Sequence, residues 1–220
     1  EPGEVQIISA EFDEEGVFVY QAFNDAIADW ALENQRFGGP AFNPERMTWI
    51  KPSFAWVLYR SGYGRKHNQS RVLKVKLPHD AFAELLALCQ CKDGGGGSKG
   101  RVQWDPARDL LAADGKVPRK MLRKRAIQIG LKGSVSAKYV SSVASIQDVT
   151  DLAHRIGDVH RMKPGKPATV AAWEELTPLL PTETDYVPRC EPRVLKRLGM
   201  LPGATADMVS RIGLGKTASK

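Results

Sequence analysis

The amino-acid sequence predicts a single α+β domain, on three observations. Short segments in which apolar and polar residues alternate are typical of strands. Between them lie segments whose apolar residues are spaced as on one face of a helix. The two kinds follow one another in the order β-β-α-β-α-β-α-β-β-α-α, without the regular βαβ repeat of a doubly wound parallel sheet. We therefore expect mixed or antiparallel strands flanked by helices.

The chain begins with two strand segments and a helix. Gly16–Ala22 alternates strongly and predicts a strand, whereas Val5–Ser9 alternates only weakly. Asn24 is a good N-cap for a helix over Asp25–Gln35. The run Gly38-Gly39-Pro40 then ends that helix, because glycine and proline both interrupt helical backbone.

The remaining elements follow from the same criteria. Met47–Ile50 predicts a short strand, and Pro52 suits the first turn of the next helix, where its missing N–H is not needed. Arg71–Leu77 alternates cleanly and predicts a further strand. Beyond it, the pattern predicts a helix over Ala81–Gln90 capped by Asp80, strands over Val102–Asp105 (ended by Pro106) and Arg125–Leu131, a helix from Ser134 or Ser136 to Val143, a helix over Val149–Val159 capped by Asp148, and a short helix around Trp173, Leu176 and Leu179.

Composition divides the chain into a domain and an extension. Residues 1–163 hold most of the predicted elements, whereas residues 164–220 are basic and rich in proline and small residues. A run of four glycines and a serine within residues 93–99 packs nothing, so we interpret it as an engineered linker that replaces a loop. Because the chain begins at Glu1 rather than Met, we expect a trimmed chain. We expect its last residues, about fifteen of them, to be mobile.

The charge balance favours anionic partners. The chain has 220 residues and a formal net charge of +7, which suits phosphates, RNA or DNA. The alternative is that the surplus of Lys and Arg only keeps the chain soluble. No apolar run approaches the ~20 residues of a membrane span, so we expect no membrane partner, and we favour a monomer.

Cysteine and histidine usage excludes several classes of site. Cys89, Cys91 and Cys190 are odd in number and fit neither a disulfide framework nor a zinc site, which favours an intracellular location, cytoplasmic or nuclear. The four histidines are scattered, so we predict no metal site. There is no Walker A loop, G-x-S-x-G or G-x-G-x-x-G motif. No nucleophile–base pair is evident, so serine or cysteine hydrolase chemistry is not expected.

The segment Arg46–Arg60 alternates cations with large aromatic residues. Lys and Arg are rarely buried without a partner, yet here they lie beside Trp, Phe and Tyr, which favour burial. A cleft with aromatic walls, whose polar groups converge on an anion, resolves this conflict. The pattern therefore predicts a nucleotide or nucleic-acid ligand, and it does not by itself name a reaction.

Lys51 is the leading candidate for binding an anion. It precedes Pro52, so its backbone is held extended at a helix start, where free amides attract anions. The alternative is that its stem packs on Trp49 while its head reaches water. Arg46 and Arg60 flank the segment and suit bidentate phosphate recognition, or else pair with nearby carboxylates.

Polar residues in otherwise apolar strands are further candidates. Gln21 ends one strand, and Gln128 lies between two isoleucines of another. A glutamine offers a donor and an acceptor to a base or an amide. We expect both to face one cleft from neighbouring or nearly neighbouring strands of one sheet; alternatively, each faces solvent or is satisfied by protein groups. We take Gln21, Lys51 and Gln128 as catalytic candidates. The ligand-binding candidates are Tyr20, Arg36, Arg46, Thr48, Trp49, Ser53, Tyr59, Arg60, Gln103, Trp104 and Asp105.

Some of these candidates also have structural interpretations. Thr48 and Ser53 could cap a helix instead of binding a phosphate. Trp104 could stack on a base or be a core residue, and Asp105 could cap the turn before a proline.

Five segments, in their order along the chain, resemble domain-of-unknown-function family 4291, which is found in bacteria and fungi. They are Val19–Ala22, Glu45–Gly62, Arg71–Leu73, Arg101–Pro106 and Ile127–Leu131. The string Met47–Phe54 is the most specific part. The resemblance runs from about Gln6 to His160 and leaves the residues after Lys163 outside. In that family a longer segment precedes Val102, which supports the linker interpretation. The family has no settled activity, so the resemblance names a lineage.

The layout is also similar to that of ADP-ribosyltransferases and RNA 2′-phosphotransferases. A strand ending in Tyr20-Gln21, a helix, a Thr48-Trp49 strand, a second helix and a Val-Leu-Lys-Val strand follow in the same order. Those proteins grip NAD in a split α+β sheet, so the resemblance implies a split sheet and NAD as the ligand. In that comparison Gln21 falls where a His or Arg normally holds the nicotinamide ribose. Gln128 falls near where a Glu often sits.

Three functions fit these observations. The leading hypothesis is a transferase of that type, which uses NAD, modifies a nucleic acid and works by positioning and electrostatics. The rival is a non-catalytic module for RNA or single-stranded nucleic acid, in which Trp49, Trp56 and Trp104 stack on bases. A third is a regulatory domain that binds a nucleotide without turnover. An enzyme should gather its polar groups in one deep pocket, whereas a strand-binding module should spread cations along an open groove.

Overall fold

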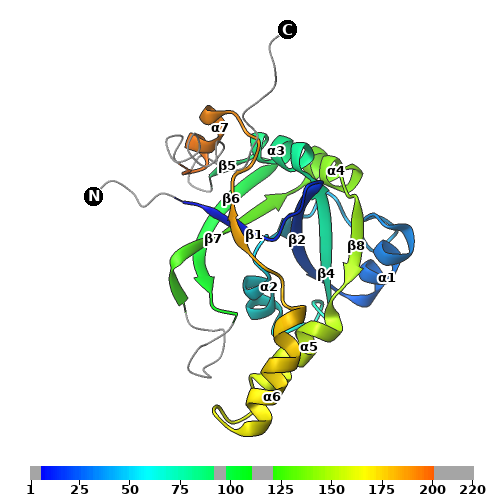
Figure 1. Cartoon of the computed structure of the whole chain (residues 1–220). Coiled ribbons are helices and arrows are strands. Elements are labelled where there is room, and N and C mark those ends of the chain that lie inside the picture. The colour runs from blue at the N-terminus through cyan, green and yellow to red at the C-terminus, as the bar shows by residue number, and fades with distance from the viewer. Residues whose placement is uncertain (1–5, 92–97, 111–120, 201–220) are drawn as a thin grey trace.

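The computed structural model of the protein describes residues 6–91, 98–110 and 121–200, with residues 121–124 described by their backbone alone. Short strands and interspersed helices form an α+β fold, as the sequence predicts (Figure 1). Residues 93–97 of the expected linker and the expected mobile end of the chain lie outside the described residues.

Three strands form an antiparallel sheet near the centre of the molecule (Figure 1). Strand β2 (Gly16–Phe23) pairs with β4 (Arg71–Pro78), and β4 pairs with β8 (Ser145–Asp148). The register places Gln21 opposite Leu73. β8 was not predicted, because its four residues include only one apolar side chain, Ile146, and carry no alternating pattern.

A second sheet carries the order β3-β7-β6-β5, in which only the β5–β6 pair is parallel. Its central pair of strands places Gln103 directly opposite Gln128. Directly opposite residues point to the same face of a sheet, so these two amides share a face. The four strands are β3 (Thr48–Ile50), β5 (Gln90–Cys91), β6 (Gly100–Arg108) and β7 (Met121–Leu131).

An isolated backbone bridge joins the two sheets. The Tyr20 N–H of β2 donates to the Lys51 carbonyl at 2.7 Å, and the Lys51 N–H donates to the Tyr20 carbonyl at 3.2 Å. Away from this bridge the strands diverge, because β2 pairs with β4 while β3 pairs with β7. The result is a sheet split into two parts, as expected.

Residues 164–200 pack into the same core as the preceding part of the described chain. Strand β9 (Thr184–Tyr186) pairs antiparallel with β1 (Ile8–Ala10). Tyr186 joins the main apolar cluster, as do the buried residues of the last helix, α7 (Pro192–Arg197). Residues 164–200, expected to be an extension, thus contribute both a strand and core side chains.

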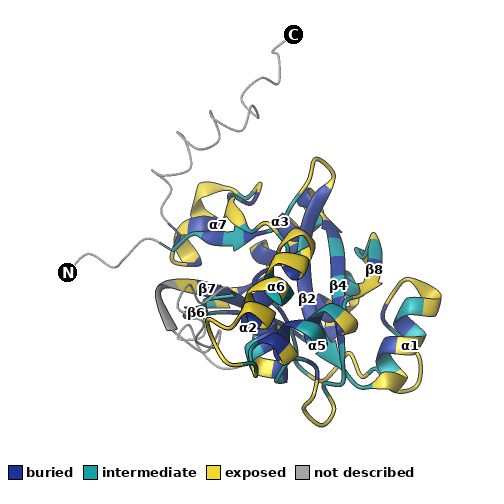
Figure 2. Ribbon diagram, turned by 60° about the horizontal axis from the view of Figure 1, so that its bottom comes forward, coloured by how far each residue is buried: buried dark blue, intermediate teal, exposed yellow. Residues whose placement is uncertain are grey.

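Helices cover the outer surfaces of the sheets and turn their exposed residues outward, most visibly in α1, α6 and α7 (Figure 2). Helix α2, which follows β3, packs against both β2 and β6 and so spans the two sheets. The helices besides α7 are α1 (Asp25–Asn34), α2 (Phe54–Ser61), α3 (His79–Ala87), α4 (Gly133–Ser141), α5 (Thr150–Val159), α6 (Pro167–Leu176) and the short 3₁₀ helix η1 (Thr177–Leu179).

Two apolar clusters lie on opposite faces of the three-stranded sheet. Val17 and Val19 of β2 belong to the main core with residues of α3 and α4. Tyr20 points to the other face, since side chains alternate along a strand. There it packs on Phe54 of α2, with ring centroids 4.8 Å apart, in a smaller cluster that also contains Ile156 of α5.

Three predicted boundaries are corrected by the structure. Helix α2 begins at Phe54 rather than at Pro52, because the Ser53 side chain is the N-cap and accepts the Trp56 N–H. Asp80 lies inside the first turn of α3 and does not cap it. Pro106 does not end β6. It sits within the strand beside an irregularity in the register, where its missing N–H is tolerated.

Candidate functional site

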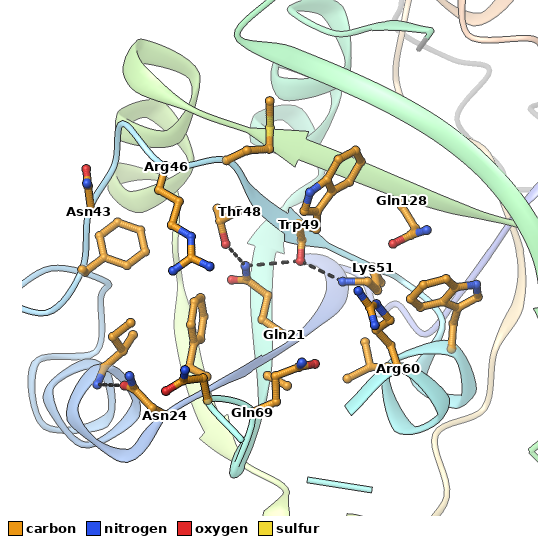
Figure 3. Close-up of a pocket in the computed structure, with 18 of the residues that line it drawn as sticks. Gln21, Asn24, Asn43, Arg46, Thr48, Trp49, Lys51, Arg60, Gln69 and Gln128 are labelled. Carbon is orange, nitrogen blue, oxygen red and sulfur yellow. Dashed lines mark hydrogen bonds between the residues drawn. The ribbon is translucent and has the colours of Figure 1, made fainter. Parts of the chain in front are cut away.

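A cleft of about 670 Å³ opens where the two sheets diverge. Its lining comes from the end of β2, the loop before β3, β3 itself, α2, and the paired strands β6 and β7 (Figure 3). The chain folds this way because the Tyr20–Lys51 bridge holds β2 and β3 together at one point only. The residues that line the cleft are Gln21, Ala22, Phe23, Asn24, Ile27, Ala41, Phe42, Asn43, Arg46, Met47, Thr48, Trp49, Lys51, Trp56, Val57, Arg60, Asn68, Gln69, Gln103, Asp105 and Gln128.

Lys51 and Arg60 form one cationic end of the cleft (Figure 3). The Lys51 ammonium donates to the Trp49 carbonyl at 3.2 Å and lies 5.5 Å from the centre of the Trp56 ring. Burial, reinforced by the positive charge of Arg60, lowers the pKa of Lys51 to about 8, although Asp105 opposes the shift. An anion in this part of the cleft would therefore stabilise the charged form of Lys51.

Arg46 lies on the other side of Gln21, near Asn43 (Figure 3). Its side chain is exposed, and within the described residues it forms no ion pair. The rings of Phe23 and Phe42, which also line the cleft, are 6.3 Å apart and meet edge to face. The lining thus combines cations with aromatic surfaces beyond the two indoles.

Gln21 lies between the two cationic ends and is almost completely buried, with 2% of its surface exposed. Its amide nitrogen donates to the Thr48 hydroxyl at 2.8 Å and to the Trp49 carbonyl at 3.4 Å. Its carbonyl oxygen accepts the Tyr139 hydroxyl at 2.7 Å. These bonds link β2 to β3 and α4 at the point where the backbone pairing of β2 with β3 has ended.

The paired strands β6 and β7 supply a polar wall. Gln103 donates its amide N–H to Asp105 at 2.6 Å. Among the described residues that line the cleft, Asp105 carries the one acidic side chain. Gln128, opposite Gln103, is 7% exposed and lines the cleft, and none of the described residues hydrogen-bonds its amide. A buried amide without a protein partner is costly unless water or a ligand satisfies it.

The Trp49 indole lies across β7 because Gly130 stands opposite it. A Cβ at Gly130 would come within 3.0 Å of the indole and 2.9 Å of the Met47 sulfur. Trp56 is 8% exposed, and its indole N–H is buried without a partner in the described structure. Both indoles thus form fixed parts of the cleft wall.

Nine of the sequence-predicted candidates come together in this cleft, from both sheets and α2. They are Gln21, Arg46, Thr48, Trp49, Lys51, Arg60, Gln103, Asp105 and Gln128. Gln21 and Gln128 do line one cleft, but their strands belong to different sheets, because β2 and β7 are separated at the split.

Five candidates lie elsewhere. The hydroxyl of Tyr20 donates to Glu11 at 2.7 Å on the opposite face of β2 from Gln21. The Arg108 guanidinium covers the Tyr59 ring at 3.8 Å. Trp104 donates its indole N–H to the Leu198 carbonyl at 2.8 Å, on the opposite face of β6 from Gln103. The two others are Ser53, which caps α2, and Arg36, which lies 5.8 Å from the Trp30 ring.

Other lining residues were not predicted as ligand-binding residues. Asn24 was predicted only as a helix cap, which it is, since its side chain accepts the Ile27 N–H at 3.1 Å. Asn43 and Gln69 lie in loops whose polar composition is typical of any surface loop. Tyr139 lies 118 residues from Gln21, so no local pattern could have connected the two.

The chemistry available in the cleft depends on charge, amides and aromatic surfaces. Of the described residues that line it, none is a histidine or a cysteine. Across the part of the chain that the structure describes, no group of three His, Cys, Asp or Glu side chains could hold a metal ion. In the same ranges, no helix combines the length and the apolar character that crossing a membrane requires.

Comparison with known protein families decides the lineage. A family model described as "Domain of unknown function (DUF4291)" matches residues 7–186. The chain belongs to this family. The DUF4291 match extends beyond the expected end near His160 and includes α6 and β9, which agrees with the packing of β9 on β1. No curated protein matches the chain.

Proposed function

We propose that the cleft binds a nucleotide and that the protein is a transferase that uses NAD as donor and acts on a nucleic acid. The observation that carries the proposal is the composition of the lining. Among the described residues, Arg46, Lys51 and Arg60 line one cleft with a single carboxylate, Asp105, and with the indoles of Trp49 and Trp56. Cations attract phosphates, and aromatic faces suit a planar base.

The size and polarity of the cleft suit a ligand such as NAD. Ligand pockets commonly enclose about 300–1,000 Å³, and this cleft of about 670 Å³ falls within that range. Lys51 and Arg60 would hold a phosphate, and Gln128 offers a donor and an acceptor to a carboxamide. When bound, NAD would supply an ADP-ribosyl group that is already activated for transfer.

The absence of a histidine from the lining favours catalysis by positioning rather than by an activated nucleophile of the protein. Lys51 and Arg60 would stabilise negative charge on the ligand, and the indoles would exclude water from it. The gathering of polar groups in one cleft supports an enzyme over a module that tracks a strand. Trp104 lies away from the cleft, so the alternative function, a nucleic-acid-binding module, lacks the third of its proposed stacking residues.

The cysteines support the proposed location. None of Cys89, Cys91 and Cys190 forms a disulfide in the described structure. Cysteines outside disulfides are usual where the environment is reducing, so we propose a location inside the cell, in the cytoplasm or the nucleus.

A thermal-shift panel tests the proposal. NAD, ATP and short single-stranded RNAs are each added to the protein, because a ligand that binds the folded state raises its Tm. We expect NAD to raise the Tm of the wild type and to have a smaller effect on Lys51→Ala. A shift with RNA alone would favour the nucleic-acid-binding module instead. Release of nicotinamide in the presence of RNA or DNA then separates a transferase from a regulatory domain that only binds.

A further inference from the structure

A chain of hydrogen bonds runs from the core to the surface of the cleft. The Tyr139 hydroxyl donates to the Gln21 carbonyl oxygen at 2.7 Å, and the Gln21 amide donates to the Thr48 hydroxyl oxygen at 2.8 Å. Tyr139 is fully buried at 0% exposure, Gln21 is nearly so, and Thr48 lines the cleft.

Trp49 fixes the direction in which these hydrogen bonds are donated. Its carbonyl lies 3.4 Å from the Gln21 side-chain nitrogen and can only accept a hydrogen bond. The nitrogen end of the amide must therefore face β3, which leaves the oxygen end to accept from Tyr139. Because the Thr48 hydroxyl oxygen already accepts from Gln21, its own hydrogen is left to donate. No acceptor for that hydrogen is found among the described residues.

We propose that the relay Tyr139–Gln21–Thr48 turns the Thr48 hydroxyl into a dedicated donor for an acceptor oxygen of the bound ligand. This inference rests on the proposed nucleotide site and deepens it. Thr48 contacts the ligand, while Gln21 and Tyr139 are positioning residues that act through it. The ligand atom at Thr48 is a phosphate or carbonyl oxygen, since both accept and neither donates. A ligand acceptor is favoured at this position, because a ligand N–H could use only the remaining lone pair of the hydroxyl and would leave the hydroxyl hydrogen without an acceptor.

The protein offers well-matched variants. Thr48→Val removes the hydroxyl, keeps the branched shape and suits a strand. Thr48→Ser keeps the hydroxyl. Tyr139→Phe removes only the distant hydroxyl, and the ring keeps its stacking on Phe37, with centroids 5.6 Å apart.

Calorimetric titration of NAD into these variants is the test. We expect Thr48→Val to weaken binding about tenfold, the effect of one lost hydrogen bond, and Thr48→Ser to bind nearly as the wild type does. Tyr139→Phe should weaken binding about threefold to fivefold in the wild-type background and have no further effect in the Thr48→Val background. A residue with a merely structural role would lower the Tm without this coupling. Independent, additive effects of the two substitutions would overturn the relay.

Titration of ADP-ribose, which lacks nicotinamide, identifies the oxygen. If Thr48→Val weakens NAD and ADP-ribose equally, the acceptor belongs to the ADP-ribose part, as a phosphate oxygen does. If only NAD is weakened, the acceptor is the carboxamide carbonyl. Equal affinity of wild type and Thr48→Val for both ligands overturns the relay and leaves the nucleotide site standing. Failure of the wild type to bind NAD, ADP-ribose or inorganic pyrophosphate overturns both proposals.

Discussion

Tyr20 and Lys51 exchange two backbone hydrogen bonds, at 2.7 Å and 3.2 Å, where the three-stranded and the four-stranded sheet meet. The bridge fixes Lys51 at the mouth of the split, and it places Gln21, the residue after Tyr20, inside the cleft. Side chains rather than backbone then connect β2 to β3, through the bond from Gln21 to Thr48. The candidate site therefore lies where the regular pairing of strands stops.

The first prediction concerns pH. Burial lowers the pKa of Lys51 from an ordinary value near 10.5 to about 8, with Arg60 adding to the shift and Asp105 opposing it. An anionic ligand favours the charged form, so NAD should bind most tightly below pH 8 and more weakly as the pH rises through 8. At high pH the loss of NAD affinity should level off. Its size should be about tenfold for each unit by which the bound anion raises the pKa of Lys51. Calorimetry at pH 6.5 to 9.5 measures it.

The matched control is Lys51→Arg, which stays charged across this range and should show a flat profile. In the absence of ligand, the stability of the fold should change with pH in the opposite direction to the affinity for NAD. The folded state disfavours the charged Lys51, so the free energy of unfolding should rise as the pH increases from about 8 towards 10.5. An identical pH profile in the wild type and Lys51→Arg would mean that Lys51 does not titrate at the binding site.

The second prediction concerns Arg60. Removing its charge in Arg60→Ala should weaken NAD binding at pH 7 by about threefold to tenfold and make the binding less sensitive to salt. It should also raise the pKa of Lys51, because the charge of Arg60 helps to lower it. The midpoint of the pH profile should move upward. Lys166→Ala removes an exposed charge outside the cleft and should change neither quantity.

The third prediction concerns Gln128. Its amide has no partner among the described residues, so Gln128→Leu should leave the Tm of the free protein unchanged or higher. The same substitution should weaken NAD binding about tenfold, because the ligand loses an amide partner. Gln147→Leu, on the exposed β8, is the control and should leave binding unaltered. A large drop in Tm with full affinity would give Gln128 a structural role only.

Sequence reasoning identified the segment that forms the cleft and most of its charged groups. Lys51 and Gln128, which both line the cleft, could be singled out because a polar side chain inside an apolar strand or an aromatic segment needs an explanation that local structure does not provide. Trp104 does not line the cleft, and strand alternation already places it on the face opposite Gln103 and Asp105. Adjacent residues of one strand could not all have faced one ligand.

The remaining lining residues could not be predicted from the sequence. Their positions depend on contacts between distant segments, as when Tyr139 of α4 meets Gln21 of β2. The assignment of the two sheets also depended on a single bridge, which no periodicity encodes. Nothing in the sequence therefore indicates that the strands of Gln21 and Gln128 lie in different sheets. In the structure β2 and β7 belong to different sheets.

The fourth prediction concerns the C-terminal part of the chain. The Glu183 carboxylate accepts the Phe54 N–H at 2.6 Å, at the start of the helix that carries Trp56 and Arg60. Glu183→Ala should lower the free energy of unfolding by about 1 kcal/mol, as the loss of a helix-terminal carboxylate does. Chemical denaturation measures this change, and Thr182→Ala, which is exposed, is the control. An unchanged midpoint for Glu183→Ala would mean that this contact does not stabilise α2.

The most direct test of the nucleotide site is a calorimetric titration of NAD into the wild type and into the double variant Lys51→Ala/Arg60→Ala at pH 7. We expect the wild type to bind one NAD saturably and the variant to lose affinity by at least about tenfold, while its Tm stays close to that of the wild type. Binding of NAD with equal affinity by both proteins would contradict this expectation, as would a wild type that binds no NAD.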